Sequence, residues 1–180
     1  NSSDFASSES PLEVVASGQN KIFKIPAGGN LQEAIKKAQS GDIIELQAGA
    51  TYYGEIKLLK KTLTDFITIR SSAFNQLKEN QQITPQQANL LAKIVTKTGG
   101  SPALSANDGA NRYRFVGIEF TSATQGYIYN LVYVATDSRN ISDIPTDLEF
   151  DRCYFHSNDN GVIRRGIGLN SANTTIKNSY

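Results

Sequence analysis

The part of the chain that most constrains its fold runs from residue 28 to residue 56, where a short amphipathic helix precedes a short strand. Asn30 is suited to cap the helix, with Glu33 three residues later as in a capping box, and Gly41 is suited to end it. Apolar residues recur at the spacing of one helical face, at Leu31, Ala34, Ile35 and Ala38. We therefore expect a helix from Leu31 to Gln39 that covers the open end of a stack of strands.

The same stretch carries a resemblance to a known superfamily. The sequence NLQEAIKKAQSGDIIELQAGATYYGEI resembles the N-terminal cap and first coil of right-handed parallel β-helices of the pectate-lyase-like superfamily. The shared pattern is a helix, then S-G-D-x-I-x-L, then G-x-T-Y-x-G. The resemblance implies an all-β fold, a right-handed parallel β-helix over residues 12–180 with a short N-terminal capping α-helix. It leaves function open, because lyases, hydrolases, epimerases and non-catalytic surface proteins share this fold.

Internal repetition in the second half of the chain also favours stacked coils. The segment Phe115–Phe120 can be aligned with Phe150–Phe155, and Ile176–Tyr180 begins a third copy, at offsets of 35 and then 26 residues. Each copy has a strand, a one-residue bend and a second strand, as expected of coils that bury one another's faces. Residues 71–92 are rich in Gln and Asn and are predicted to leave the stack. A Greek-key sandwich is the rival fold, but it predicts more hairpin turns of the Asp108-Gly109 type.

Composition limits the classes of protein to which the chain can belong. Its 180 residues suit one domain, and the net charge of +1 argues against nucleic-acid binding through bulk basicity. No apolar run approaches the length of a membrane span. The single cysteine, Cys153, excludes an internal disulfide and a thiolate metal site, and is expected to be a small core residue.

The polar character of the chain favours a secreted or cell-surface protein. Ser, Asn, Thr and Gln are plentiful, Met is absent, and the chain starts with the Ser-rich sequence NSSDFASSES. We expect residues 1–11 to be a flexible N-terminal segment of a processed chain or a fragment. The last residues, 173–180, read as the opening of another coil. We expect further β-helix coils, or another chain, to cover that end, since exposed strand edges recruit other strands.

The segment from Asp147 to Asn173 holds the candidate site residues. Strand alternation predicts that Glu149 points outward, and that Tyr154 and His156 point outward after the bend. A polar loop over residues 157–161 follows, and then the pair Arg164-Arg165. This arrangement favours a groove for an anionic polysaccharide, because arginine pairs in a bidentate manner with a uronate carboxylate.

The resemblance implies a chemistry for such a groove. Lyases of this superfamily neutralise the uronate carboxylate with Arg or Lys while a base removes the acidified proton. By this comparison Arg164 or Arg165 would neutralise the carboxylate, and His156, Tyr154 or Arg152 would exchange the proton. The product would carry an unsaturated end.

The resemblance also implies a binding surface and a cation. Tyr154 and Glu149 are expected to contact the polysaccharide. Lyases of the superfamily often use Ca²⁺ held on Asp, Glu and Asn, so Asp151 and Asp159 are the candidate ligands for a possible Ca²⁺ ion. No other cofactor is expected.

Structural roles explain the same residues equally well. Asp151 and Arg152 are suited to form a local ion pair at a corner, and Arg164 and Arg165 to bond loop carbonyls or a carboxylate. His156 is the only histidine of the chain, and lone surface histidines are usually solvated. The first functional hypothesis is therefore a secreted, lyase-like protein acting on an acidic polysaccharide. The alternative is a non-catalytic extracellular module for adhesion or assembly.

Overall fold

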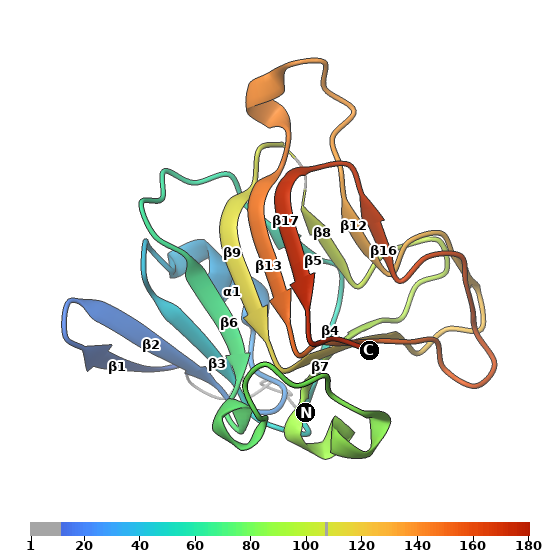
Figure 1. The fold of residues 1–180 in the computed structure, drawn as a ribbon, viewed down its shortest axis with the longest axis horizontal. Coiled ribbons are helices and arrows are strands. Elements are labelled where there is room, and N and C mark those ends of the chain that lie inside the picture. Colours follow the sequence, from blue (N-terminus) through green and yellow to red (C-terminus); the bar gives the residue numbers. More distant parts are fainter. Residues whose placement is uncertain (1–11, 107) are drawn as a thin grey trace, which may run out of the picture.

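A computed structural model of the chain describes residues 12–106 and 108–180, and nearly all of the regular structure in this part is β-strand (Figure 1). The helices are α1 (Leu31–Lys37) and the short 3₁₀ segments η1 (Phe74–Gln76), η2 (Pro85–Leu90) and η3 (Ile141–Asp143). The all-β prediction is therefore confirmed. The flexible segment predicted over residues 1–11 lies outside the described residues. None of the helices described is long and apolar enough to cross a membrane.

The strands of the described residues form four sheets, named here A to D. Sheet A has the order β1 (Glu13–Ser17), β2 (Asn20–Ile25), β3 (Ile43–Leu46), β6 (Ile67–Ser71), β9 (Asn111–Val116), β13 (Thr146–Asp151), β17 (Ala172–Lys177). Sheet B has the order β14 (Tyr154–Phe155), β10 (Ile118–Ser122), β7 (Ala92–Thr96), β4 (Thr51–Tyr53). Sheet C has the order β16 (Ile167–Leu169), β12 (Val132–Val134), β8 (Leu104–Ala106), β5 (Ile56–Leu58). Sheet D pairs β11 (Tyr127–Ile128) with β15 (Val162–Ile163).

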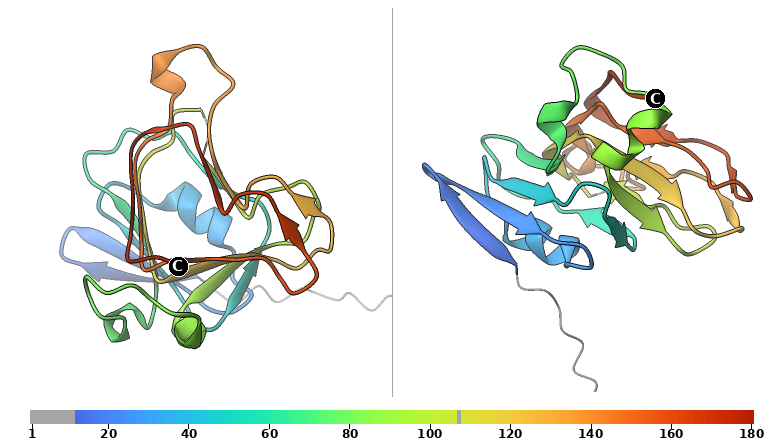
Figure 2. Two further views of the ribbon diagram at one scale, coloured as in Figure 1. Left: turned by 45° about the vertical axis from the view of Figure 1, so that its right-hand side comes forward. Right: turned by 90° about the horizontal axis from the view of Figure 1, so that it is seen from below.

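The chain visits these sheets in a fixed order. From β3 onward it passes from sheet A to sheet B, then to sheet C, and returns to sheet A one strand further along. In the last two circuits it also forms a strand of sheet D between sheets B and C. Figure 2 shows the later circuits almost superimposed in its left view. In the described chain, β1 with β2 is the one antiparallel pair, so the Greek-key alternative is wrong.

The pairing register confirms the repeat that the sequence predicts. Phe150 pairs with Phe115 on one side and with Ile176 on the other, and Phe155 pairs with Phe120. The rings of Phe115 and Phe150 stack with centroids 5.1 Å apart, and those of Phe120 and Phe155 with centroids 5.2 Å apart. Each circuit therefore buries the aromatic side chains of its neighbours in one core.

Helix α1 caps this core, as predicted. Its apolar face, Leu31, Ala34 and Ile35, is buried in the same hydrophobic cluster as the strands. At the N-terminus, Asn30 Oδ1 accepts a hydrogen bond of 3.0 Å from the Glu33 N–H, which satisfies one of the free backbone donors.

The helix ends two residues before the predicted end, at Lys37 instead of Gln39. The backbone of Ala38 is already extended, with φ −60° and ψ 141°. Lys61 then supplies the hydrogen bonds that the helix lacks, because its Nζ donates to the carbonyls of Ile35, Lys36 and Ala38 at 2.7, 2.9 and 2.5 Å. Burial lowers the pKa of Lys61, and the carboxylate of Asp42 partly offsets this effect.

Left-handed bends follow strands of sheet A at equivalent places in three circuits. Gly117, Arg152 and Asn178 all have a left-handed backbone, with φ of 67°, 52° and 54°. Glycine and asparagine adopt this conformation readily, whereas arginine does so at a cost of about 1 kcal/mol. The Arg152 position must therefore be held by its surroundings.

The Gln- and Asn-rich excursion predicted over residues 71–92 is present, and it lies over these bends. We name residues 72–91 the strap. Leu77, Ile83 and Leu91 form a small hydrophobic cluster of their own, against which Tyr154 packs. The Ile83 N–H donates to the Asn178 carbonyl at 3.0 Å. The strap therefore connects several circuits from outside.

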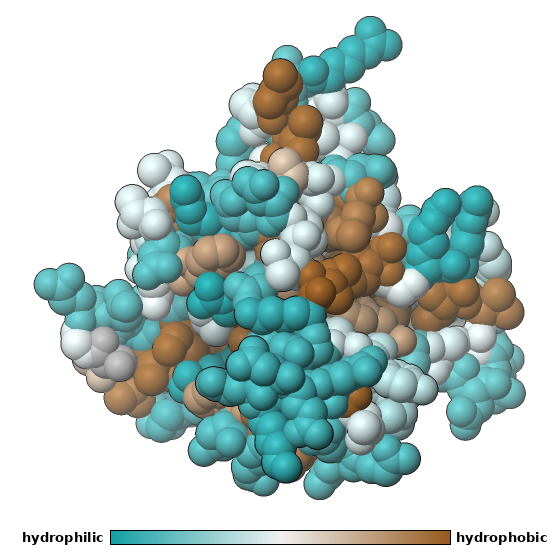
Figure 3. All heavy atoms as spheres, in the orientation of Figure 1, coloured by the Kyte–Doolittle hydropathy of each residue, from teal (hydrophilic) through white to brown (hydrophobic). Residues whose placement is uncertain are grey.

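At β17 and β16, the last strands of sheets A and C, inward-facing side chains reach the surface. Ile176 and Leu169 are 42% and 46% exposed. Figure 3 shows hydrophobic surface in the area where Figure 1 has β16 and β17. Charged side chains on the outer face of sheet A are paired instead, as between Arg70 and Glu45 at 2.7 Å.

Candidate functional site

The structure distributes the predicted site residues over separate places. Glu149 lies on the outer face of sheet A, and Asp151 with Arg152 lies at the bend that follows. The pair Tyr154 and His156 lies on the outer face of sheet B, whereas Asp159, Arg164 and Arg165 lie further along, on exposed positions before β16. The predicted residues therefore do not form one site.

Glu149 is held by two cations of neighbouring strands. Its carboxylate lies 2.8 Å from Arg114 Nε and 2.6 Å from Lys177 Nζ. Burial raises the pKa of Glu149, but the bonds from Lys177 and Arg114 outweigh burial and hold the pKa below its usual value. The predicted contact of Glu149 with substrate stays a prediction, and its observed contacts tie β9, β13 and β17 together.

The local ion pair between Asp151 and Arg152, expected as a structural alternative, is confirmed. Arg152 donates to Asp151 Oδ2 from Nε at 3.1 Å and from Nη2 at 2.8 Å, and to the Leu77 carbonyl from Nη1 at 2.9 Å. Asn178 Nδ2 donates to Asp151 Oδ1 at 2.9 Å. Both side chains are nearly buried, so the pair anchors the strap to the bend.

The carboxylates proposed as calcium ligands are far from forming a metal site. Both oxygens of Asp151 already accept hydrogen bonds, and Asp159 is exposed in the loop after His156. In the described ranges, 12–106 and 108–180, no group of three or more His, Cys, Asp or Glu residues could hold a metal ion. A Ca²⁺ ion on Asp151 and Asp159 stays a prediction.

Tyr154 and His156 point outward together, as strand alternation predicts. Their rings stack with centroids 4.2 Å apart. His156 Nε2 lies 3.0 Å from Glu119 Oε1, and His156 Nδ1 lies 2.7 Å from the Ser157 carbonyl oxygen. Lys93 Nζ approaches the same Glu119 oxygen at 3.2 Å. Glu119 and Lys93 are the members of this cluster that sequence reasoning missed.

These contacts favour the protonated form of His156. Since a carboxylate and a carbonyl can only accept, both contacts are hydrogen bonds at once only when both ring nitrogens donate, that is, in the imidazolium. The bond to Glu119 raises the pKa of His156, while burial and the Lys93 charge lower it by less. An imidazolium with both N–H groups engaged has no free nitrogen with which to remove a proton from a substrate.

Glu119 itself is only partly satisfied. Its side chain is 3% exposed, and its second oxygen, Oε2, is buried without a hydrogen-bond partner. Thr121 Oγ1, two residues along the same strand, is buried and unpartnered in the same way. Because both of these oxygens are buried, neither is open to a ligand from solvent.

A more open site lies where sheets C and D meet. A hollow of about 410 Å³ is lined by Gly100, Pro102, Tyr129, Asn130, Tyr133 and Arg165. The lining contains two aromatic rings and one cation and no acidic side chain. We name it the tyrosine–arginine hollow. Of the predicted residues, only Arg165 belongs to it.

Parallel stacking of three circuits builds the hollow. Residues 127–134 and 162–169 pair in register, with Tyr133 opposite Gly168. The Leu131 N–H donates to the Arg165 carbonyl at 3.0 Å, and the Ala103 N–H donates to the Leu131 carbonyl at 2.8 Å. Backbone bonds to both neighbours therefore fix the segment that carries the tyrosines.

Gly168 makes room for one wall of the hollow. An added Cβ at Gly168 would lie 2.5 Å from Asn130 Oδ1, which is buried and has no hydrogen-bond partner. The Asn130 side chain therefore fills the space that a larger residue opposite Tyr133 would occupy. Only glycine at 168 permits this packing.

Sequence reasoning missed the tyrosines, although a signal was present. The segment GYIYNLVY places Tyr127 and Tyr129 at alternate positions just before the apolar strand β12. Alternation predicts that both point to the same, outer face. Both are indeed exposed.

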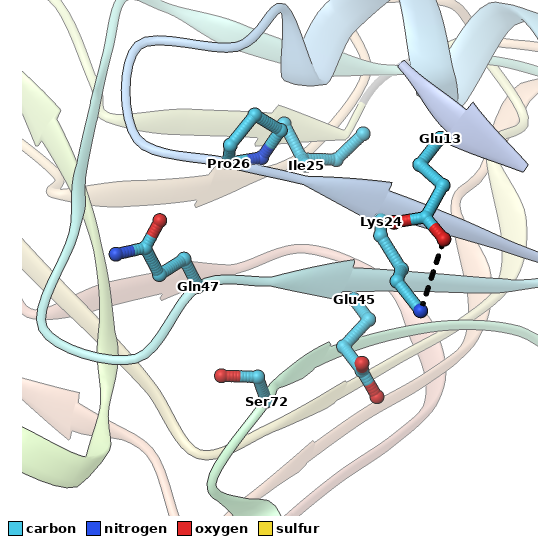
Figure 4. Close-up of a pocket in the computed structure, with 7 residues that line it drawn as sticks. All are labelled: Glu13, Lys24, Ile25, Pro26, Glu45, Gln47 and Ser72. Carbon is cyan, nitrogen blue, oxygen red and sulfur yellow. Dashed lines mark hydrogen bonds and ion pairs between the residues drawn. The ribbon is translucent and has the colours of Figure 1, made fainter. Parts of the chain in front are cut away.

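A second hollow, of about 250 Å³, lies on the outer face of sheet A near β1 and β2 (Figure 4). Its charged groups are already neutralised. Lys24 pairs with Glu13 at 3.2 Å, and Glu45 pairs with Arg70 at 2.7 Å. This hollow therefore has no unpaired charge with which to select a ligand.

Comparisons of the chain with protein families, with curated proteins and with solved structures each found no match. Function must therefore be inferred from the geometry of the molecule.

Proposed function

We propose that the stacked circuits form a right-handed parallel β-helix closed at its N-terminal end by α1. The support is the repeated passage from sheet A to B to C with parallel pairing at every return. Crossover connections between parallel strands of one sheet are right-handed in almost all proteins, which supports the hand.

On this scaffold, the chain binds an acidic polysaccharide at the tyrosine–arginine hollow. The observation that carries the proposal is an exposed arginine, Arg165, beside two tyrosines in a concavity without an acidic side chain. Arg165 is in no ion pair within the described part of the chain. Its guanidinium therefore remains available for an anionic group.

The chemistry of the lining matches an acidic sugar. Arginine binds a carboxylate through two parallel hydrogen bonds, which gives both energy and orientation. Tyrosine has an apolar ring against which the C–H face of a sugar can pack, and a hydroxyl that can bond its oxygens. The volume of the hollow, about 410 Å³, lies within the range of ligand sites.

Binding is better supported than cleavage. Elimination needs a base near the uronate ring, but both nitrogens of His156 are engaged, and this residue follows β14 of sheet B and does not line the hollow. Arg152 is buried in its pair with Asp151. These contacts favour the non-catalytic module for adhesion or assembly over a lyase. An extracellular location is part of this proposal, since acidic polysaccharides of this kind lie outside cells.

Isothermal titration calorimetry with oligogalacturonate, oligoalginate and a neutral oligosaccharide of equal length tests the proposal. We expect binding of at least one acidic oligomer and a loss of about tenfold or more in affinity for Arg165→Ala, because a hydrogen bond to a charged group contributes about 1.5–3 kcal/mol. Arg139→Ala, which removes another exposed arginine, is the matched control and should leave affinity unchanged. Equal affinity for neutral and acidic oligomers, or none for either acidic oligomer, would overturn the proposal. Ultraviolet-absorbing unsaturated ends would restore the lyase hypothesis.

A further inference from the structure

The aromatic surface does not stop at the tyrosine–arginine hollow. Tyr127 and Tyr129 are 44% and 55% exposed, and their rings meet edge to face with centroids 4.8 Å apart. Tyr129 lines the hollow, whereas Tyr127 lies outside it, on sheet D. The two rings together therefore extend the hollow along the surface.

The next circuit adds a second arginine to this surface. Val162 pairs with Tyr127 and is 56% exposed. The Arg164 N–H donates to the Ile128 carbonyl at 2.9 Å, which places Arg164 in the layer beside Tyr129. Arg164 is exposed and, in the described ranges, belongs to no ion pair. The surface thus carries two tyrosine rings, Tyr129 and Tyr127, and two guanidinium groups without an ion pair, those of Arg165 and Arg164.

The backbone beneath Tyr127 is held tightly. The Gly100 N–H donates to the Tyr127 carbonyl at 2.8 Å. Gly99 and Gly126 lie so close that a Cβ on Gly126 would be 2.9 Å from Gly99 Cα. This close contact of two circuits fixes the Tyr127 backbone, so the exposed ring is carried on a well-anchored support.

We infer that Tyr127 and Arg164 form a second subsite, and that the ligand is a chain of acidic sugars lying across sheet D into the hollow. This inference rests on the proposed function. A single sugar in the hollow would contact Arg165 and leave Tyr127 unused. A chain brings a second ring onto Tyr127 and a second carboxylate within reach of Arg164. Exposed single tyrosines are common on proteins, but this one pairs with an exposed valine and contacts the ring of Tyr129, which lines the hollow and lies in the layer of Arg164.

Affinity measured against chain length tests the inference. The acidic sugar is chosen as the one whose oligomers bind the wild-type chain, galacturonate or mannuronate. The wild-type chain is then titrated with the monomer of that sugar and with oligomers of increasing length. We expect the affinity for the dimer to exceed the affinity for the monomer. In Tyr127→Ala the ratio of these two affinities should be about three- to tenfold smaller, which is the size expected for one aromatic contact. Arg164→Ala should reduce the same increase. Both variants should bind the monomer as the wild type does, measured by competition against a longer oligomer.

Tyr53→Ala is the matched control, since Tyr53 is 55% exposed on sheet B, away from the hollow. It should leave every affinity unchanged. Affinity independent of chain length, or a loss on Tyr127→Ala that is equal for monomer and oligomers, would overturn the second subsite while leaving the hollow as a binding site. Failure of every acidic oligomer to bind would instead overturn the proposed function itself.

Discussion

The Cβ that alanine would add at Gly168 lies 2.5 Å from Asn130 Oδ1, closer than such atoms approach. Gly168→Ala must therefore displace Asn130 from the wall of the tyrosine–arginine hollow. We expect it to reduce the free energy of unfolding by about 1–3 kcal/mol, as overpacking of a filled site does. Urea unfolding followed by circular dichroism measures the loss.

A double-variant cycle identifies the cause. If Asn130 is the group displaced, Gly168→Ala should cost much less in an Asn130→Ala background, because the truncated side chain leaves the space free. Gly99→Ala is the control, since its Cβ would lie 3.4 Å from Gly126 Cα, an ordinary contact. Equal costs of Gly168→Ala in both backgrounds would show that Asn130 is not involved.

His156 makes stability depend on pH in a defined direction. Because its folded pKa is raised above the ordinary value of 6.5, chiefly by the Glu119 carboxylate, the folded state binds the proton more tightly than the unfolded state. The stabilisation is fully present below pH 6.5 and is lost as the pH rises through the folded pKa. The stability difference between wild type and His156→Gln should therefore shrink from acid to alkaline pH in urea titrations. A difference that grows with pH would contradict the imidazolium assignment.

At the scale of elements, the register of the repeats was predictable and the strain within them was not. The match of Phe115–Phe120 with Phe150–Phe155 was visible because aromatic residues recur on both sides of a bend. A second set of left-handed positions, Arg112, Asp147 and Asn173, also stacks in register, with φ of 53°, 54° and 52°. Arginine at position 112 carries no signal for this conformation, because L side chains of its kind rarely adopt it and the stacking of neighbouring circuits holds it there.

The strap should loosen when its tether is removed. Arg152 holds the Leu77 carbonyl and Asp151 together, so Arg152→Ala breaks the tether and leaves a buried carboxylate with fewer partners. Removing one member of a buried ion pair costs about 3–5 kcal/mol. In hydrogen-exchange mass spectrometry we expect peptides from residues 72–91 to exchange faster by a larger factor than peptides from β6 and β7.

The exposed Arg139 again supplies the matched control, as Arg139→Ala should leave exchange of the strap unchanged. Uniform acceleration over the whole chain in Arg152→Ala would show that the ion pair stabilises the stack generally and not the strap. Unchanged exchange would show that the hydrophobic cluster of Leu77, Ile83 and Leu91 is sufficient by itself.

At the scale of the whole molecule, the sequence revealed the layers but not the site. The helical cap, the outward direction of Tyr154 and His156 and the burial of Cys153 follow from local patterns. The tyrosine–arginine hollow instead combines residues from three successive circuits, which contribute Gly100, Tyr129 and Arg165 in turn. No local pattern joins such residues, and only the stacking of circuits brings them together.

Cys153 offers a test of how the stack unfolds. The side chain is fully buried among residues of the single large core cluster, which contains strands from β2 to β13. Burial raises the pKa of its thiol to about 12, so the reactive thiolate is scarce in the folded state. If the circuits unfold as one cooperative unit, alkylation of Cys153 requires global unfolding and should be slower than in urea by roughly 10³-fold or more. Mass spectrometry measures the labelling rate.

The dependence of this rate on urea distinguishes cooperative from local opening. In the cooperative case, the free energy of unfolding derived from labelling should equal the free energy of unfolding from circular dichroism. Both should fall with urea concentration with the same slope, since this slope reports the surface area exposed on unfolding. Ser142→Cys, at an exposed position, provides the control and should be labelled rapidly in native buffer. Cys153 itself could instead be labelled rapidly while the circular dichroism spectrum of the β-strands stays unchanged. That result would mean that the circuits around β13 and β14 open separately from the cap, because each circuit packs mainly against its neighbours.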